Sequence, residues 1–364
     1  MRATLAARPL LRGATLGVAR VVLVGGVGLL LLVLVVGVAL GSVSVPLDDS
    51  AAILARRFLG LPLRPDWSAA AETIIVDLRL PRVLSAMLVG AALGGAGVVF
   101  QALLRNPLAD PYVIGTAAGA SLGAIVGILL PVLVPALALG AGSAWLGIGI
   151  AQVLAFAGGV GAVIVVFAVA RTTAGVPVVS LLLTGYAVSS LLAAAIALLM
   201  FVSGRALGAI FAWLMGSLAG ASWGQLAVAT PLVALSSVVL VVRWRRLNVL
   251  LLGDEAAAHL GIHVEREKLR LTLLATLATS AAVAISGTIG FVGLVIPHVL
   301  RTLIGPDHRL LLPASMLYGA TLLALADLGA RLAGGVPVGI VTALIGAPFF
   351  IYLLRRNRYR AFAA

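Results

Sequence analysis

Residues 111–170 read PYVIGTAAGASLGAIVGILLPVLVPALALGAGSAWLGIGIAQVLAFAGGVGAVIVVFAVA, sixty consecutive positions without Asp, Glu, Lys or Arg. One membrane-spanning helix needs about 20 apolar residues. The stretch therefore holds at least two spans, and it offers no charged side chain to water. This segment alone predicts that the chain lies in a lipid bilayer.

The composition of the whole chain supports the same prediction. Of 364 residues, 62% are hydrophobic and 10% are charged, and the mean hydropathy is +1.20. A soluble domain carries about a quarter charged residues. The net charge of +13 is also a feature of nucleic-acid binders, but these are soluble and rich in lysine, whereas this chain has one lysine, Lys268. We therefore expect lipid, and no nucleic acid, as its partner. The absence of cysteine excludes disulfides and thiolate sites.

Breaks at proline, glycine and polar residues divide the uncharged runs into ten expected spans. These are 21–40, 83–104, 113–131, 145–170, 178–202, 225–242, 269–286, 289–304, 311–330 and 336–354. A secretory signal is the alternative for the first, but its apolar core exceeds the usual length of about 7–15 residues and no A-x-A site follows. The predicted fold class is an all-α polytopic membrane protein with one transmembrane domain, residues 1–364.

The basic residues predict which side of the membrane each loop occupies. With both termini in the cytoplasm, 18 of the 25 basic residues face the cytoplasm, as the positive-inside rule requires. The other seven face outward: Arg56, Arg57, Arg64, Arg79, Arg82, Arg205 and Arg331. The longest cytoplasmic connection is then 243–270.

No phosphate loop of the GxxxxGK[ST] type is possible, because the single lysine lies between Glu267 and Leu269. The chain therefore does not hydrolyse nucleotide by that route. No catalytic constellation stands out, and we expect no catalytic residues, resident metal or cofactor. The pair His259 and His263 has a zinc-capable spacing, but a solvated pair is the favoured interpretation.

Asp327 falls well inside the ninth expected span, where a carboxylate costs about 2.5–3.5 kcal/mol on insertion scales. Arg331, four residues further on, is its candidate partner on the same helix face. The alternative is proton coupling by Asp327 and His298 in an ion-driven secondary transporter. A structural ion pair is the favoured interpretation.

Glycine spacing predicts two features of the helices. Gly115, Gly119, Gly123 and Gly127 recur every four residues, a pattern typical of closely packed membrane helices. In SGTIGFVGLVIPH, residues 286–298, glycines recur every three residues and a proline follows. That spacing predicts an interrupted helix, a feature with which transporters build pathways.

The cytoplasmic connection contains GDEAAAHLG at 253–261, where Asp254 and Glu255 would begin a short amphipathic helix. This segment resembles the coupling helix of the FecCD family, the permease subunits of ABC importers for iron-siderophores, haem and cobalamin. Five further stretches are similar to family motifs. They are RLPRVLSAMLVGAALGGAGVVFQALLRNPLADP (79–111), FAWLMGSLAGASW (211–223), GFVGLVIPHVLR (290–301), DHRLLLP (307–313) and VPVGIVTALIGAPFFIYLL (336–354).

The resemblance implies a non-enzymatic permease with ten spans in the plasma membrane of a bacterium. It implies two copies of an ABC ATP-binding subunit, an extracytoplasmic substrate-binding protein, and a second permease subunit that is either identical or related. A ferric siderophore is the cargo expected first, with haem or cobalamin as the alternatives.

The resemblance also implies roles for particular residues. Coupling to the ATPase through the helix at 253–263 would use Gly253, Asp254, Glu255, Ala258, Leu260 and Gly261. Acidic groups of the binding protein would dock on Arg56, Arg57 and Arg331. The translocation path and its gate would include Val179, Ser180 and Thr184, although two valines stand where the family often has hydroxyl residues. Arg331 thus has two interpretations, ion-pair partner and docking cation, and the sequence leaves both open.

Overall fold

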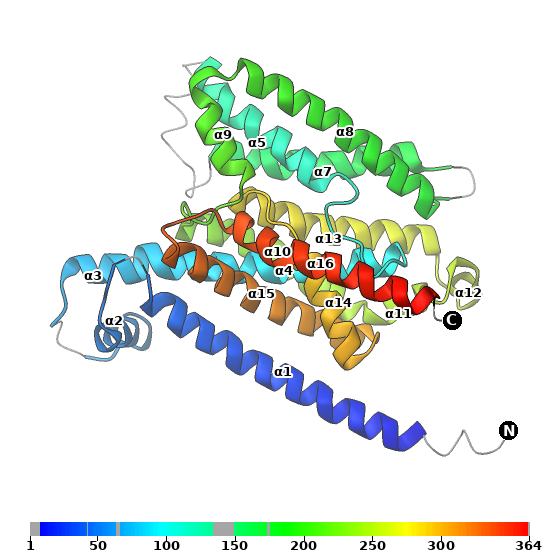
Figure 1. Ribbon diagram of the computed structural model, residues 1–364, viewed down its shortest axis with the longest axis horizontal. Helices are drawn as coiled ribbons and strands as arrows, with labels where there is room; N and C mark the ends of the chain where they lie inside the picture. Colours follow the sequence, from blue (N-terminus) through cyan, green and yellow to red (C-terminus); the bar gives the residue numbers. More distant parts are fainter. Residues whose placement is uncertain (1–7, 42, 63–65, 134–148, 173–174, 363–364) are drawn as a thin grey trace.

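The computed structural model describes residues 8–41, 43–62, 66–133, 149–172 and 175–362, which form helices joined by turns and short loops (Figure 1). Within these ranges eight helical segments are long and apolar enough to cross a membrane. They are Arg20–Ala39 of α1 (Arg8–Ala39), the continuous segment Ala69–Leu103, α5 (Thr116–Leu133), α7 (Ile150–Ala170), α8 (Val178–Val202), α10 (Trp223–Val242), α13 (Val264–Ser286) and α15 (His308–Leu332). The chain is an all-α polytopic membrane protein.

Other helices complete the chain. The apolar ones are α9 (Leu207–Leu214), α14 (Val292–Ile304) and α16 (Val338–Phe362), of which Val338–Leu353 is the apolar part. Three others lie at the two ends of the molecule: α2 (Leu47–Leu59), α11 (Trp244–Leu250) and α12 (Asp254–His259). The predicted spans match the apolar segments to within a few residues, except the second, which begins earlier at Ala69. As helices, α1 begins before its predicted span and α16 continues beyond its predicted span. The start of the predicted span 145–170 lies partly outside the described residues.

The segment Ala69–Leu103 changes its winding part-way. It comprises α3 (Ala69–Thr73), a π-helix (Ile74–Arg79) and α4 (Leu80–Leu103). The N–H of Leu80 donates to the carbonyl of Ile75, five residues back. Short π segments in proteins often occur at functional positions. Here the π segment ends at Arg79, whose side chain reaches the end of α1.

α4 is the central helix of the molecule and packs against α15, α13, α14 and α10 (Figure 1). Its glycines permit this, because a Cβ at Gly90 would lie 2.2 Å from Gly319 O, and a Cβ at Gly94 would lie 2.2 Å from Ser315 O. Membrane helices associate closely through such small residues, since lipid supplies no hydrophobic drive between them. The backbones of α4 and α15 therefore touch directly.

The glycine repeat in α5 has the same effect against α7. A Cβ at Gly119 would lie 2.3 Å from Gly158 O, and one at Gly123 would lie 1.9 Å from Leu154 O. The prediction of close packing for this repeat is confirmed. In Figure 1, α5, α7 and α8 form a layer beside the larger group of helices around α4.

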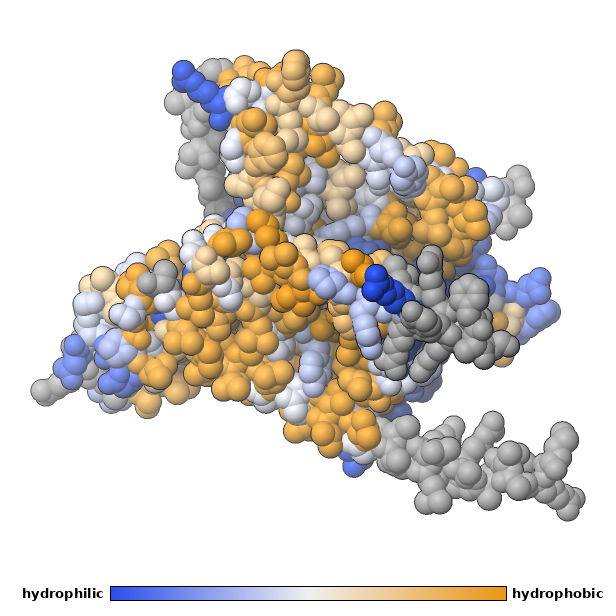
Figure 2. All heavy atoms as spheres, in the orientation of Figure 1, coloured by the Kyte–Doolittle hydropathy of each residue, from blue (hydrophilic) through white to orange (hydrophobic). Residues whose placement is uncertain are grey.

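The surface is apolar along the helices and polar at the two ends. Figure 2 shows hydrophobic side chains over most of the visible face, with hydrophilic ones gathered mainly at the two ends of the long axis. The start of α1, the end of α16 and α12 lie together at one end, and α2 and α3 lie at the other (Figure 1). This arrangement suits a protein whose long axis crosses the bilayer.

Candidate functional site

The predicted coupling segment forms a short helix bounded by two glycines. Gly253, directly before α12, has φ +110°, and Gly261, just after it, has φ +78°. Only glycine adopts this region without steric cost. The two glycines thus let the chain turn sharply on both sides of a helix that is only six residues long.

Asp254 holds α12 against two membrane helices. Its carboxylate accepts a hydrogen bond of 2.6 Å from Lys268 Nζ on α13 and forms an ion pair with Arg105, just beyond the end of α4. Ala257 is completely buried on the same side. The side chain of Asp254 therefore serves to attach α12, and a movement of α12 would reach both α4 and α13.

The opposite side of α12 is exposed. Glu255, Ala258, Leu260 and Gly261 face outward, and so do two leucines from the preceding turn that the sequence did not single out, Leu251 and Leu252. Leu252 and Leu260 are 65% and 62% exposed. We call Leu251, Leu252, Ala258 and Leu260 the apolar knob. Exposed leucines at a polar end of the molecule are typical of a surface that contacts another protein.

A second attachment joins α11 to α15. Asn248 Nδ2 donates to Asp307 Oδ1 at 2.8 Å, and the backbone N–H of His308 donates to Asn248 Oδ1 at 3.0 Å. Asp307 also caps the start of α15 by accepting from the N–H of Arg309. The segment that contains the knob is thus attached to α4, α13 and α15.

The predicted interrupted helix is confirmed. α13 ends at Ser286, residues 287–291 are not helical, and α14 begins at Val292. Gly287 and Phe291 have φ +67° and +70°. Non-helical backbone inside a membrane protein must find hydrogen bonds within the protein.

Contacts with other parts of the chain supply those bonds. The hydroxyl of Tyr112 donates to Ile289 O at 3.0 Å and accepts from Ile289 N–H at 3.3 Å. Thr288 Oγ1 donates to Leu214 O at 2.6 Å. The carbonyl of Gly293 has no helical donor, because Pro297, four residues on, lacks an N–H. The amide of Gln101 lies over this turn, with Nε2 3.2 Å from Leu294 O and 3.5 Å from Gly293 O.

Asp110 supports the same arrangement from the connection between α4 and α5, outside the membrane-spanning segments. Its carboxylate accepts from the backbone N–H of Tyr112 at 2.9 Å. Burial raises the pKa of Asp110 to about 6, and the hydrogen bond from Tyr112 offsets only part of this shift. The carboxyl therefore titrates near neutral pH beside the residue that holds the break in the helix.

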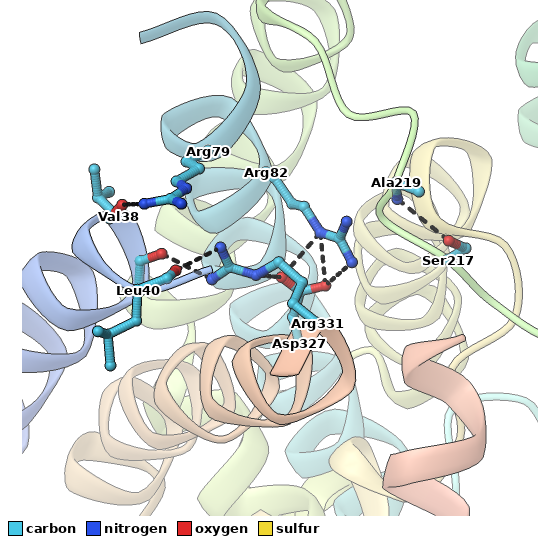
Figure 3. Close-up of polar contacts among 9 residues, drawn as sticks. Val38, Leu40, Arg79, Arg82, Ser217, Ala219, Asp327 and Arg331 are labelled. Carbon is cyan, nitrogen blue, oxygen red and sulfur yellow. Dashed lines mark hydrogen bonds and ion pairs between the residues drawn. The ribbon is translucent and has the colours of Figure 1, made fainter. Parts of the chain in front are cut away.

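A cluster of charges lies at the other end of the molecule, around Asp327. Arg82 donates to both oxygens of this carboxylate, with Nε 3.0 and 3.1 Å from them and Nη2 2.9 Å from Oδ1. Arg331 Nε lies 3.2 Å from Asp327 Oδ2. Figure 3 shows Asp327 between the two guanidinium groups. The predicted pair of Asp327 and Arg331 is thus confirmed, but Arg82, on α4, makes the closer and bidentate contact.

Arg331 and a further arginine, Arg79, cap the last turn of α1. Arg331 donates to Gly37 O at 2.8 Å and Leu40 O at 3.1 Å, while Arg79 donates to Val38 O at 3.1 Å and Ala39 O at 2.6 Å (Figure 3). The last carbonyls of a helix have no partner within it, and cations are favoured there. Arg79, counted from the sequence as an outward-facing charge, is buried, and only 8% of the Arg331 side chain is exposed.

The structure places the other predicted residues on two exposed helices. Arg56 and Arg57 are exposed in the last turn of α2. Val179 is 67% exposed on α8, and Ser180 and Thr184 are half-buried beside it. Thr184 lines a shallow groove of about 390 Å³ together with Val169, Leu183, Ala187, Val188 and Leu191.

These features match a known family of transporters. The FecCD transport family matches residues 29–356. This chain belongs to the FecCD transport family. A FecCD protein is a permease of an ABC importer for iron chelates, haem or cobalamin, so the chain is a multi-pass membrane transport component and not an enzyme. Such a permease works with an ATPase and a substrate-binding protein.

Individual relatives have different named cargoes at similar identity. The chain is 41% identical over 306 residues to the cobalamin import system permease protein BtuC of Halobacterium salinarum, covering 82% of this chain and 78% of that one. It is 39% identical over 335 residues to the hemin transport system permease protein HmuU of Yersinia pestis, covering 90% and 95%. It is 40% identical over 301 residues to the Fe(3+) dicitrate transport system permease protein FecD of Escherichia coli, covering 81% and 90%.

A solved structure described as an inward-facing conformation of a metal-chelate type ABC transporter has the same fold. The TM-score is 0.77 at 32% identity, over 92% of this chain and 98% of that one. Membership of the FecCD family corrects the alternative of an ion-driven secondary transporter. Asp327 forms ion pairs with two arginines, in agreement with a structural role.

Proposed function

We propose that this FecCD chain is one of two permease subunits that together pass a ferric siderophore across the plasma membrane of a bacterium. In this proposal each permease has ten spans, the eight long ones with α14 and α16, and both termini lie in the cytoplasm. Two ATP-binding subunits supply the energy, and an extracytoplasmic binding protein delivers the cargo. Haem and cobalamin are the alternative cargoes.

The apolar knob is the observation that carries the proposal. It lies at the same end as the start of α1 and the end of α16, the end to which the positive-inside rule assigns the cytoplasm. It is exposed, and it is attached through Asp254 and Asn248 to α4, α13 and α15. When the ATP-binding subunits close on ATP, a movement of the knob would therefore be transmitted to the membrane helices.

Two exposed surfaces support the proposal of a second permease and a binding protein as partners. Within α8, which is described throughout, only Leu181 and Gly185 are buried, so a second permease has an apolar helix to cover. Arg56 and Arg57 extend from the end opposite the knob, where acidic groups of a binding protein would reach them. We leave Arg331 out of the docking surface, because its guanidinium is engaged by Asp327 and by α1.

The test of coupling is to change Leu252 and Leu260 to Glu in the complex assembled with its ATPase. We expect loss of ATPase binding and of uptake, because two carboxylates would replace the apolar contact. Leu59→Glu is the matched control, since Leu59 is 73% exposed at the opposite end. Full uptake in the Leu252 and Leu260 double variant would refute the coupling role.

Asp254→Asn and Gly261→Ala separate attachment from contact. We expect both variants to keep the ATPase but to hydrolyse ATP with reduced uptake, because α12 is then less firmly held.

Charge reversal of Arg56 and Arg57 should weaken the binding protein's affinity without affecting ATPase binding. Unchanged affinity would remove these two residues from the docking surface.

Cargo is tested by uptake into proteoliposomes that contain the complete complex. Radiolabelled ferric siderophores are expected to accumulate with ATP, whereas haem and cobalamin are not. Accumulation of haem or cobalamin alone would replace the siderophore proposal and leave the coupling proposal intact.

A further inference from the structure

A cavity of about 650 Å³ lies between the end of α7 and the start of α13. Its size falls within the range of about 300–1,000 Å³ that is typical of small-molecule sites. We call it the α7–α13 cleft. The walls are apolar and the mouth is polar. The wall residues are Val163, Ile164, Phe167, Ala168, Leu269 and Leu273.

The mouth of the cleft carries two arginines, Arg171 at the end of α7 and Arg266 in the first turn of α13. Both are exposed, and among the described residues neither has a carboxylate within ion-pair distance. Glu265 also lines the mouth, but its carboxylate already contacts other groups of the protein. Its Oε2 accepts from the N–H of Val176 at 2.8 Å, and its Oε1 lies 3.9 Å from Lys268 Nζ.

The positive charge continues on the other side of Arg266. This residue also lines a second cavity of about 230 Å³. The other charged or titratable residues around that cavity are Arg243, Arg246, His263, Glu267 and Arg270. Glu267 is paired, with Oε1 2.6 Å from Arg243 and Oε2 3.8 Å from Arg270. Arg266 therefore lies between the mouth of the cleft and a second cavity that is rich in guanidinium groups.

The cleft has the shape and polarity of a phospholipid. Val163 lies eight residues before Arg171, which corresponds to about 12 Å of helix directed into the membrane. An acyl chain would lie along these apolar walls, while the phosphate would meet the two arginines at the level where headgroups lie. Basic pockets between membrane helices at the cytoplasmic side are suited to anionic headgroups.

We propose that the α7–α13 cleft binds an anionic phospholipid, with its phosphate on Arg171 and Arg266 and an acyl chain between α7 and α13. Such a lipid would join the end of α7 to the start of α13. Because Lys268 on α13 also holds Asp254 of α12, the lipid would steady the base of the coupling segment. The ATPase activity of the assembled complex is then expected to depend on anionic lipid.

The test uses the full chain, purified in detergent and supplied with phosphatidylglycerol or phosphatidylcholine, with bound lipid measured by native mass spectrometry. We expect phosphatidylglycerol to be retained in preference. Arg171→Gln with Arg266→Gln should weaken its retention about 30-fold, since each basic residue near a membrane surface contributes about a factor of five. Arg171→Lys with Arg266→Lys should restore most of it.

Two further variants separate a lipid site from a general charge effect. Arg245→Gln removes an exposed arginine at the same end, outside both cavities, and should leave retention unchanged. Leu269→Trp fills the cleft without altering charge, and it should reduce retention of phosphatidylglycerol. Equal retention in the double Gln variant and the original chain would overturn the proposal.

Two other occupants have distinct outcomes. If inorganic phosphate displaces phosphatidylglycerol and Leu269→Trp has no effect, the site binds a free anion and the lipid proposal is wrong. If the double Gln variant keeps its lipid but loses the ATPase subunit, the arginines form a protein contact, which also overturns it. Loss of lipid with the ATPase still bound supports the lipid site and leaves the proposed transport function untouched.

Discussion

Helices α4 and α8 differ in one respect that composition does not reveal. Both lie in long apolar segments with the same mean hydropathy, yet 19 of the 24 residues of α4 are buried, whereas α8 buries two of 25. α4 contains four glycines, and a Cβ on Gly90, Gly94 or Gly97 would collide with the backbone of α14 or α15. α8 contains one glycine, Gly185, at the place where it meets residues 113 and 114.

The comparison separates two properties of a membrane helix. Hydropathy decides whether a segment enters the bilayer, because each apolar side chain lowers the free energy of insertion. Small residues decide which neighbour it contacts, because they let backbones approach. α4 is therefore the framework of the permease, and α8 keeps an open apolar surface.

The largest expected effect comes from removing the charge that joins α4 to α15. Asp327→Asn leaves Arg82 and Arg331 without their counter-charge in a buried site, which costs about 3–5 kcal/mol of stability. Unfolding of the purified chain in detergent by denaturant measures the loss. Thr184→Val, which removes a polar group from α8, is the control and should change little. Equal stability of Asp327→Asn and the original chain would contradict the structural role of this cluster.

A smaller loss is expected from closing the space between α4 and α14. In Gly97→Ala the new Cβ would lie 1.8 Å from Gly293 O, a backbone atom that cannot rotate away. Overpacking of this kind costs about 1–3 kcal/mol. The matched control is Gly161→Ala in α7, where nothing lies within 4 Å of the new methyl and a gain of up to about 1 kcal/mol is expected. A similar loss from both variants would show that helix contact is not the cause.

Asp110, in the connection that follows α4, predicts that the stability of the protein depends on pH. The pKa of Asp110 in the folded protein is about 6, above its ordinary value of 3.8, so the folded state binds this proton more tightly than the unfolded state. Stability therefore falls as pH rises from about 4 to 6 and is level above that. In Asp110→Asn this contribution is absent, while an oxygen remains to accept from Tyr112. The Tm of Asp110→Asn minus that of the original chain, followed from pH 4.5 to 7.5, should rise up to about pH 6 and then stay level. A constant difference would contradict the prediction.

The smallest effect on folding is expected on the open face of α8. Leu191 is 71% exposed, so Leu191→Ala should change the stability of the isolated chain by less than about 0.5 kcal/mol. Its effect should appear in assembly, as weaker pairing with the second permease in size-exclusion chromatography of the complex. A stability loss similar to that of Gly97→Ala, without any change in pairing, would show that α8 is part of the framework.

Several parts of the site follow from local sequence. The apolar runs predict the spans, the four-residue glycine repeat predicts that α5 is closely packed, and the three-residue repeat before Pro297 predicts the break after α13. The short helix α12 is also local, since Gly253 and Gly261 bound it. Each of these features depends on residues within one continuous segment, so the pattern alone carries the physical cause.

Other parts depend on residues far apart in the chain. Arg82 and Asp327 are 245 positions apart, and Arg331 reaches a carbonyl of α1 that lies 294 positions earlier. Sequence spacing predicts one partner for Asp327, namely Arg331, four residues away. The count of basic residues predicts that Arg79 faces outward. A buried carboxylate forms ion pairs with the cations that the packed helices place beside it. Here the close approach of α4 and α15 at their glycines places Arg82 beside Asp327.

The amino-acid sequence by itself determined that the chain enters a bilayer, where its helices break, and that a short helix forms between Gly253 and Gly261. It could do so because insertion and helix termination depend on neighbouring residues. Only the tertiary structure decided that α4 is central and α8 open, that Asp254 attaches α12 instead of facing outward, and that Arg331 caps α1. Burial and ion pairing belong to the packed helices together, and no single segment contains them.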